Sequence, residues 1–256
     1  MRITSGRSYI GITKNQSYMK YIALFIMLLV TGTNITGQPK REMRGVWVAT
    51  VSGIDFPSRP GISVRKQKQE IIDILERQEQ LHMNAIIFQI RPSSDAFYQT
   101  PHEPWSQWLT GEQGKPPEPE WDPLRFFIKE AHKRGMRIMV DVSINHTGIE
   151  HRWFKKATRD PESKEASYYY RNDDGSFAMW EGVPTLPQLN YTNPELRDVM
   201  FGEGDSLVRH FLRPPFRIDA WRFDVGNQTG RRGRDQLSHE IFREVRKAIK
   251  DEKQDA

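Results

Sequence analysis

Two side chains late in the chain have the spacing of a catalytic pair. The segment AWRFDV places Arg222 and Asp224 two residues apart in a short run rich in large apolar residues. Because side chains alternate between the faces of a strand, both point to the same side. An arginine beside an aspartate keeps the carboxylate ionised, which suits a nucleophile or a stabiliser of a cationic transition state. The structural alternative is a simple ion pair.

A second polar group follows an apolar run in the middle of the chain. The segment DVSINH supplies a carboxylate, an amide and an imidazole at Asp141, Asn145 and His146. These groups can hold the hydroxyls of a ligand, and they can equally close a loop.

Aromatic residues concentrate outside the apolar runs. In such loops a flat ring can stack on a sugar face, whereas a ring that serves the core is expected on a strand or helix. We expect Trp180 and Tyr170 to be sugar platforms, with a core role as the alternative. Trp105 and Trp108 are expected to pin a proline-rich loop instead.

Alternating strand and helix patterns must position these groups. Four apolar runs predict strands at 44–51, 85–92, 136–142 and 218–225, and helices are expected at 64–81, from Asp122 to Gly135, from Asn193 onward, and at 237–250. This βαβα order predicts an α/β fold of the TIM-barrel type, as a partial barrel of about four strands. Residues 143–191, between strand three and helix three, are expected to form an inserted loop subdomain.

The predicted strand ends agree with the candidate site. In βα-barrels the loops after the carboxyl ends of the strands build the active site. Gln89 and Arg91 end the second strand, and Arg91 is therefore a candidate to bind substrate.

Composition excludes some classes of function. The net charge is +5, but lysine and arginine alternate with acidic residues along the helical stretches, which favours solvated helix faces over a nucleic-acid partner. Cysteine is absent, so disulfides and thiolate metal sites are excluded.

The N-terminus has the order of a secretory signal. Lys20 precedes the apolar run YIALFIMLLV, and a small and polar stretch follows it. The run is too short to span a bilayer comfortably, and no cysteine follows it to carry a lipid anchor. We expect residues 1–37 to be an extension and signal peptide, residues 38–256 to form the barrel without a membrane span, and the protein to be periplasmic or extracellular. A buried N-terminal strand or helix is the alternative.

Three motifs of the second half resemble the α-amylase superfamily, glycoside hydrolase family 13. DVSINHTG, LPQLN and AWRFDV stand in that family's order, and GEGDSLVRHFLRPPFRIDAWRFDV resembles its cyclomaltodextrinase, neopullulanase and maltodextrin glucosidase branch. The resemblance covers about 135–256. It implies that Asp224 is the nucleophile, Arg222 its orienting partner and His146 a sugar ligand, while Asp141 and Asn145 support the loop. It requires no cofactor, and calcium at Asn145 is the metal site to test.

The first half resembles a different barrel group, the glycoside-hydrolase-like family 10 proteins. REMRGVWVATVSGIDFPS and the segment from MNAIIFQIRPSSDAFYQTP to the end of the following helix carry this resemblance, over about 41–137. It implies an exported protein that acts on cell-wall or other glycans. Its matching positions are Arg44, Trp47, Gln89, Arg91 and Asp95. The chain therefore resembles a chimera joined at strand three.

One chemical part of the α-amylase pattern is not found. That family has its general acid, a glutamate, at the end of strand five, and this sequence ends where we expect that strand to begin. Glu181 and Glu240 lie elsewhere in the predicted fold. Three hypotheses follow: a retaining hydrolase of α-glucans with weak turnover, a hydrolase of other glycans that uses first-half residues, or an inactive glycan-binding barrel. Open sheet edges predict a homo-oligomer or a half-barrel partner.

Overall fold

The computed structural model describes residues 42–92 and 95–256. The predicted N-terminal extension and signal peptide, residues 1–37, lie outside the described residues. From Met43 to Ala256 the chain is one compact unit. Within the described ranges, no helix has the length and apolar character needed to cross a membrane.

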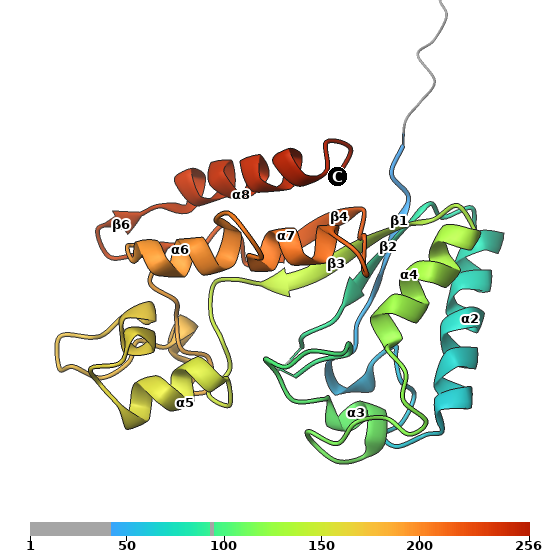
Figure 1. Cartoon of the computed structure of the whole chain (residues 1–256), viewed down its shortest axis with the longest axis horizontal. Helices are drawn as coiled ribbons and strands as arrows, with labels where there is room; N and C mark the ends of the chain where they lie inside the picture. The colour runs from blue at the N-terminus through green and yellow to red at the C-terminus, as the bar shows by residue number, and fades with distance from the viewer. Residues whose placement is uncertain (1–41, 93–94) are drawn as a thin grey trace, which may run out of the picture. The chain divides into compact units, whose positions relative to one another are not determined.

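The core element is a parallel sheet of four strands. Its strands, in the order β1-β2-β3-β4, are β1 (Gly45–Val48), β2 (Ala85–Gln89), β3 (Arg137–Ser143) and β4 (Ala220–Asp224). Helices follow the strands, as Figure 1 shows. The α/β class and the partial (β/α) barrel predicted from the sequence are confirmed.

Several helices begin at a residue whose side chain caps them. The helices are α2 (Val64–Gln80), α3 (Gln107–Thr110), α4 (Pro123–Lys133), α5 (Arg152–Arg159), α6 (Pro194–Phe201), α7 (Leu207–Leu212) and α8 (Ser238–Glu252). The carboxylate of Asp122 accepts a hydrogen bond from the Arg125 amide at the start of α4. At the start of α6, the Asn193 side-chain oxygen accepts from the Glu195 and Leu196 amides. Gly135, with φ of +69°, ends the α4 turn in the left-handed region.

Strand β1 is shorter than the predicted range 44–51. After Val48 the backbone amides are hydrogen-bonded by side chains instead of by a neighbouring strand. The Asp55 carboxylate accepts from the Ala49 amide, and the side-chain oxygen Oε1 of Gln89 accepts from the Thr50 and Val51 amides. The 3-10 turn η1 (Val51–Gly53) follows.

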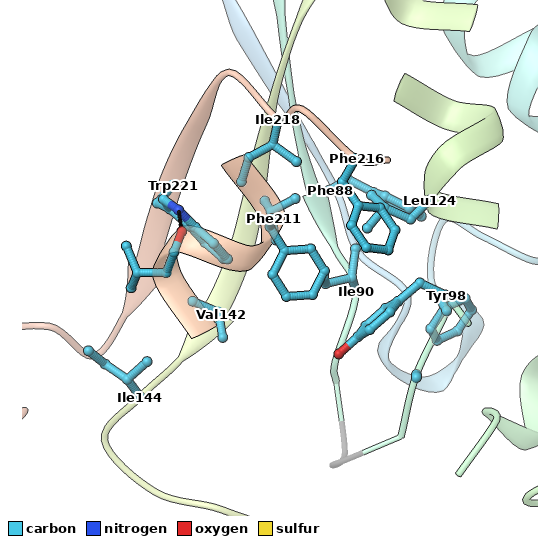
Figure 2. Close-up of a cluster of buried hydrophobic side chains, with 14 of the residues drawn as sticks. Phe88, Ile90, Tyr98, Leu124, Val142, Ile144, Phe211, Phe216, Ile218 and Trp221 are labelled. Carbon is cyan, nitrogen blue, oxygen red and sulfur yellow. Dashed lines mark hydrogen bonds between the residues drawn. The ribbon is translucent and has the colours of Figure 1, made fainter. Parts of the chain in front are cut away.

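One face of the sheet is covered by α4 and α7. Phe88 of β2 stacks on Phe127 of α4 at 4.4 Å between ring centroids. Trp221 of β4 packs edge-on against Phe211 of α7 and donates from Nε1 to the Val208 carbonyl, as Figure 2 shows. This buried cluster fixes the strands, and hence the residues that follow them.

The segment between β3 and α6 forms a lobe with little regular structure. It holds α5, the 3-10 turns η2 (Lys164–Tyr168) and η3 (Trp180–Gly182), and isolated antiparallel bridges such as His146 to Gln188. A small hairpin of β5 (Arg231–Arg232) and β6 (Asp235–Gln236), which the sequence analysis did not predict, precedes α8.

Candidate active site

The sheet register brings the predicted polar residues into rows at its carboxyl edge. Gln89 pairs with Asp141, and Asp141 pairs with Arg222. Ser143 pairs with Asp224 two residues further along these strands. Paired residues of parallel strands face the same side, so three strands contribute to one polar surface.

Arg222 connects the two carboxylates of this surface. Its Nη1 lies 2.9 Å from Asp141 Oδ1 and 2.7 Å from Asp224 Oδ1. The Asp141 side chain is 3% exposed, whereas that of Asp224 is 43% exposed. Asp224 is therefore the carboxylate that a ligand can reach, whereas the buried Asp141 holds the Arg222 guanidinium in place.

Burial and hydrogen bonds have opposite effects on the pKa of Asp141. Burial raises the pKa of Asp141, and the nearby Asp224 charge adds to this, although the hydrogen bonds from Arg222 oppose it. A side-chain hydrogen bond from Trp47 also favours its charged form. The Arg222 guanidinium lies 5.4 Å from the centre of the Trp47 ring, which gives the arginine a second contact.

The backbone is strained directly after Asp224. Val225 has φ of +45°, and a β-branched residue rarely adopts this region. The following turn, in which the Gln228 amide donates to the Val225 carbonyl, brings Gln228 against the lobe. There Gln228 contacts the Trp180 indole and donates to Glu181 at 3.0 Å. Such strain persists where the surrounding structure holds it, as at many functional sites.

His146 is fixed from two sides. Its ring stacks on Trp180, with 4.8 Å between centroids and 19° between planes. With the Asn145 amide nitrogen donating to Nδ1 at 3.2 Å, the proton of the neutral ring lies on Nε2. Burial lowers the pKa of His146 although Asp224 opposes this, so the ring is neutral near pH 7 and can donate to a hydroxyl.

These groups line a cleft of about 130 Å³, which we call the Asp224 cleft. Its residues are Trp47, Gln89, Arg91, Pro92, Asp141, Ser143, His146, Thr147, Gly148, Leu186, Arg222 and Asp224. Of the predicted site residues, the structure thus brings together Asp224, Arg222, Asp141, His146 and Arg91. Sequence reasoning singled out neither Ser143 nor Thr147; their places at the strand end were the available signal.

The two predicted sugar platforms lie elsewhere. Tyr170 is buried, and its hydroxyl donates to Asp235 at 3.0 Å. The Trp180 ring is in contact with His146 and Gln228, so it supports the histidine. Neither residue lines the Asp224 cleft among the described residues, whereas Trp47 does and is 47% exposed.

Asn145 offers one oxygen at the candidate calcium position. Asn145 is fully buried, and its Oδ1 has no hydrogen-bond partner. In the described ranges, however, no three His, Cys, Asp or Glu side chains come together to hold a metal ion. Calcium also accepts side-chain amide and backbone carbonyl oxygens as ligands, so calcium at Asn145 stays a prediction.

Arg91, two residues after the end of β2, forms a buried ion pair with Glu103. Its Nε donates to Glu103 Oε2 at 2.7 Å, and the Tyr98 hydroxyl donates to the same oxygen at 3.0 Å. The Glu103 side chain is 3% exposed. His151 Nε2 lies 3.9 Å from Glu103 Oε1, and burial lowers the pKa of His151 to about 4.

The lowered pKa of His151 predicts that the free energy of unfolding decreases in acid. The folded pKa lies below the unfolded value, so the unfolded chain binds the proton more tightly and stability falls as the pH drops below about 6.5. Between pH 7 and 5 this histidine should contribute a loss of about 2 kcal/mol in the free energy of unfolding. His151→Gln should remove that part of the pH dependence in urea titrations. His239→Gln, which changes an exposed histidine, should retain it; equal slopes for both variants would refute the assignment.

Comparisons with known proteins find relatives of both kinds that the sequence resembles, the glycoside-hydrolase-like proteins and the cyclomaltodextrinases. The sequence model of the family described as glycosyl hydrolase-like 10 matches residues 42–255. Glycosyl hydrolase YngK of Bacillus subtilis (strain 168) is 32% identical over 241 residues, which is 86% of this chain and 44% of YngK. A cyclomaltodextrinase of Geobacillus thermopakistaniensis (strain MAS1) is 27% identical over 138 residues, 50% of this chain and 21% of that enzyme.

A solved structure supports the second resemblance. The type III pullulan hydrolase from Thermococcus kodakarensis aligns with a TM-score of 0.56 and 26% identity, over 74% of this chain and 31% of that one. The chain spans less than half the length of each of these three proteins. The two resemblances expected from the sequence are confirmed, and the family match extends across both halves. Because that match covers most of the described chain, the protein belongs to the glycosyl hydrolase-like 10 family.

Proposed function

We propose that this chain acts on O-glycosidic bonds of an α-glucan or maltooligosaccharide, with Asp224 as the nucleophile of a retaining mechanism. One observation carries the proposal: an accessible carboxylate at the carboxyl end of β4 is held at 2.7 Å by an arginine that is itself anchored by a buried aspartate. Membership of a glycosyl hydrolase-like family and the similarity to a cyclomaltodextrinase support it.

Each residue then has a defined part. Asp224 attacks the anomeric carbon as the bond from that carbon to the glycosidic oxygen breaks, and the leaving sugar takes up a proton and departs. Water then hydrolyses the glycosyl ester formed on Asp224. Arg222 donates a hydrogen bond to the Asp224 carboxylate at 2.7 Å and limits its rotation. The neutral His146 donates to a sugar hydroxyl, and Trp180 holds its ring in place.

Protonation of the leaving oxygen is the step for which the described residues of this cleft are least suited. A retaining enzyme uses two carboxyl groups about 5 to 5.5 Å apart, one of which acts as the acid. The described carboxylates that line the cleft are Asp141 and Asp224, and Asp141 is buried against Arg222. Glu181 accepts from Gln228, and Glu240 on α8 pairs with Arg197. We therefore propose that the described residues supply no efficient acid.

The first prediction from this proposal compares leaving groups. A general acid contributes about 10² to 10⁴-fold, and an activated aryl leaving group does not need it. The purified chain should release nitrophenol from an aryl α-glucoside while it cuts maltooligosaccharides at least about 10²-fold more slowly in kcat. Comparable rates, on the order of 10 per second for both, would contradict the proposal.

A second candidate function has its own support. Trp47, Gln89 and Arg91, from the half that resembles the glycoside-hydrolase-like proteins, line the same cleft. A cell-wall glycan is therefore the alternative substrate, and peptidoglycan fragments belong in the same panel of reducing-sugar assays. Binding of glycans without any cleavage would favour the third hypothesis, an inactive glycan-binding barrel.

A further inference from the structure

A second cavity opens beside the Asp224 cleft. It has a volume of about 160 Å³, and we call it the Glu103 cavity. It shares Arg91, Ser143, His146 and Thr147 with the Asp224 cleft. The two spaces therefore lie on either side of the same few residues, and a chain-like ligand in one is next to the other.

The floor of the Glu103 cavity is a hydrogen-bonded polar network. Although burial favours its neutral form, the Arg91 guanidinium lowers the pKa of Glu103, so the carboxylate is ionised. Arg91 and Tyr98 both donate to it. Buried polar groups of this kind, few and fixed, are what gives a binding site its specificity.

The walls are apolar and aromatic. They include Leu189, Met200, Leu207, Phe211 and the Trp153 ring. Tyr98 stands at the edge of the buried cluster in Figure 2, edge-on to Phe211 with 5.1 Å between ring centroids. Trp153 is braced by edge contacts with His151 and Tyr168. Rigid rings beside a polar floor suit a ligand with apolar faces and hydroxyl edges.

The charges of the lining balance. Its two arginines are Arg91 and Arg152, and its two carboxylates are Glu103 and Asp205. The lining also holds four histidines: burial lowers the pKa values of His102, His146 and His151, so these three are neutral near pH 7, and His210 Nδ1 lies 3.0 Å from Asp205 Oδ1. An uncharged ligand fits this balance better than an anion or a cation.

We infer that the Glu103 cavity binds a further uncharged sugar unit of the glycan whose scissile bond lies at Asp224. This inference rests on the proposed function, because it extends the same bound chain. The structural alternative is that the Arg91 and Glu103 pair only fastens the loop after β2.

A substitution that blocks the Glu103 cavity distinguishes a sugar-binding cavity from an ion pair that only fastens the loop. Val199 on α6 lines the cavity and is 37% exposed, so Val199→Arg should obstruct it without a buried change. Leu81→Arg is the matched control, since Leu81 is exposed at the end of α2 and lines neither space. Both are made with Asp224→Asn to prevent turnover, and maltooligosaccharides from maltose to maltoheptaose are titrated by calorimetry.

In the control, affinity should rise with chain length until the Glu103 cavity is filled. Val199→Arg should bind maltose as the control does and lose about tenfold or more of the affinity for the longest chains, which corresponds to about 1.4 kcal/mol. Tyr98→Phe, which removes one floor donor, should lose part of the same gain. Equal affinities of Val199→Arg and the control at every length would overturn the inference while leaving Asp224 as the nucleophile. If no chain length binds, both proposals fail.

Discussion

Asp224→Asn should lower kcat/KM for an aryl α-glucoside by at least about 10⁴-fold, because removal of a nucleophile removes the covalent step itself. The fold should persist, since the Asp224 side chain is 43% exposed and an amide oxygen can still accept from Arg222. Thermal unfolding measured beside the kinetics checks this.

A matched control and a rescue make this result specific. Asp73→Asn makes the same chemical change at an exposed position on α2, where Asp73 accepts from Gln69, and should leave the rate unchanged. Asp224→Gly should regain aryl release when azide is added, with an inverted glucosyl azide as product. A variant at position 224 that keeps a tenth of the rate would exclude Asp224 as the nucleophile.

The second large effect is expected at Arg222. Arg222→Met leaves the Asp141 carboxylate, which is 3% exposed, without its cation, and an unpaired buried charge costs about 3 kcal/mol. The double variant Asp141→Asn with Arg222→Met should recover most of that loss, because no buried charge remains. Urea unfolding of the single and double variants gives the coupling directly.

The comparison for Arg222 is an exposed ion pair. Lys247→Met breaks the pair of Lys247 with Asp251 on α8, which is largely in solvent, and should be close to neutral. If Arg222→Met is as mild as Lys247→Met, Arg222 does not hold Asp141 in the folded protein. If the double variant is no more stable than Arg222→Met, the loss has another cause.

Local patterns predicted much of this fold. The strands, the caps at Asp122 and Asn193, and the shared orientation of Arg222 and Asp224 all follow from residues close in sequence. The bond from Arg222 to Asp141 required the register of β3 against β4, which the motif match implied only indirectly.

Other features depend on contacts that a sequence does not display. Trp180 and Tyr170 lie in loops, where sugar platforms are expected. In the structure, however, the Trp180 indole contacts Gln228 and the Tyr170 hydroxyl donates to Asp235, and both partners lie far along the chain. The Glu103 cavity is likewise assembled from the loop after β2, the lobe, and helices α6 and α7. No periodicity in the chain indicates such an assembly.

The central claim, that Asp224 forms a covalent bond to the sugar, is tested most directly by trapping that bond. A glucosyl fluoride with a second fluorine on the ring slows hydrolysis of the glycosyl ester more than its formation, so the ester accumulates. Peptide mass spectrometry of the treated protein should find one added fluoroglucosyl group, on the peptide that carries Asp224, and none on Asp224→Asn. A label on Glu103, Asp141 or any other carboxylate, or aryl glucoside turnover without any label, would contradict the account.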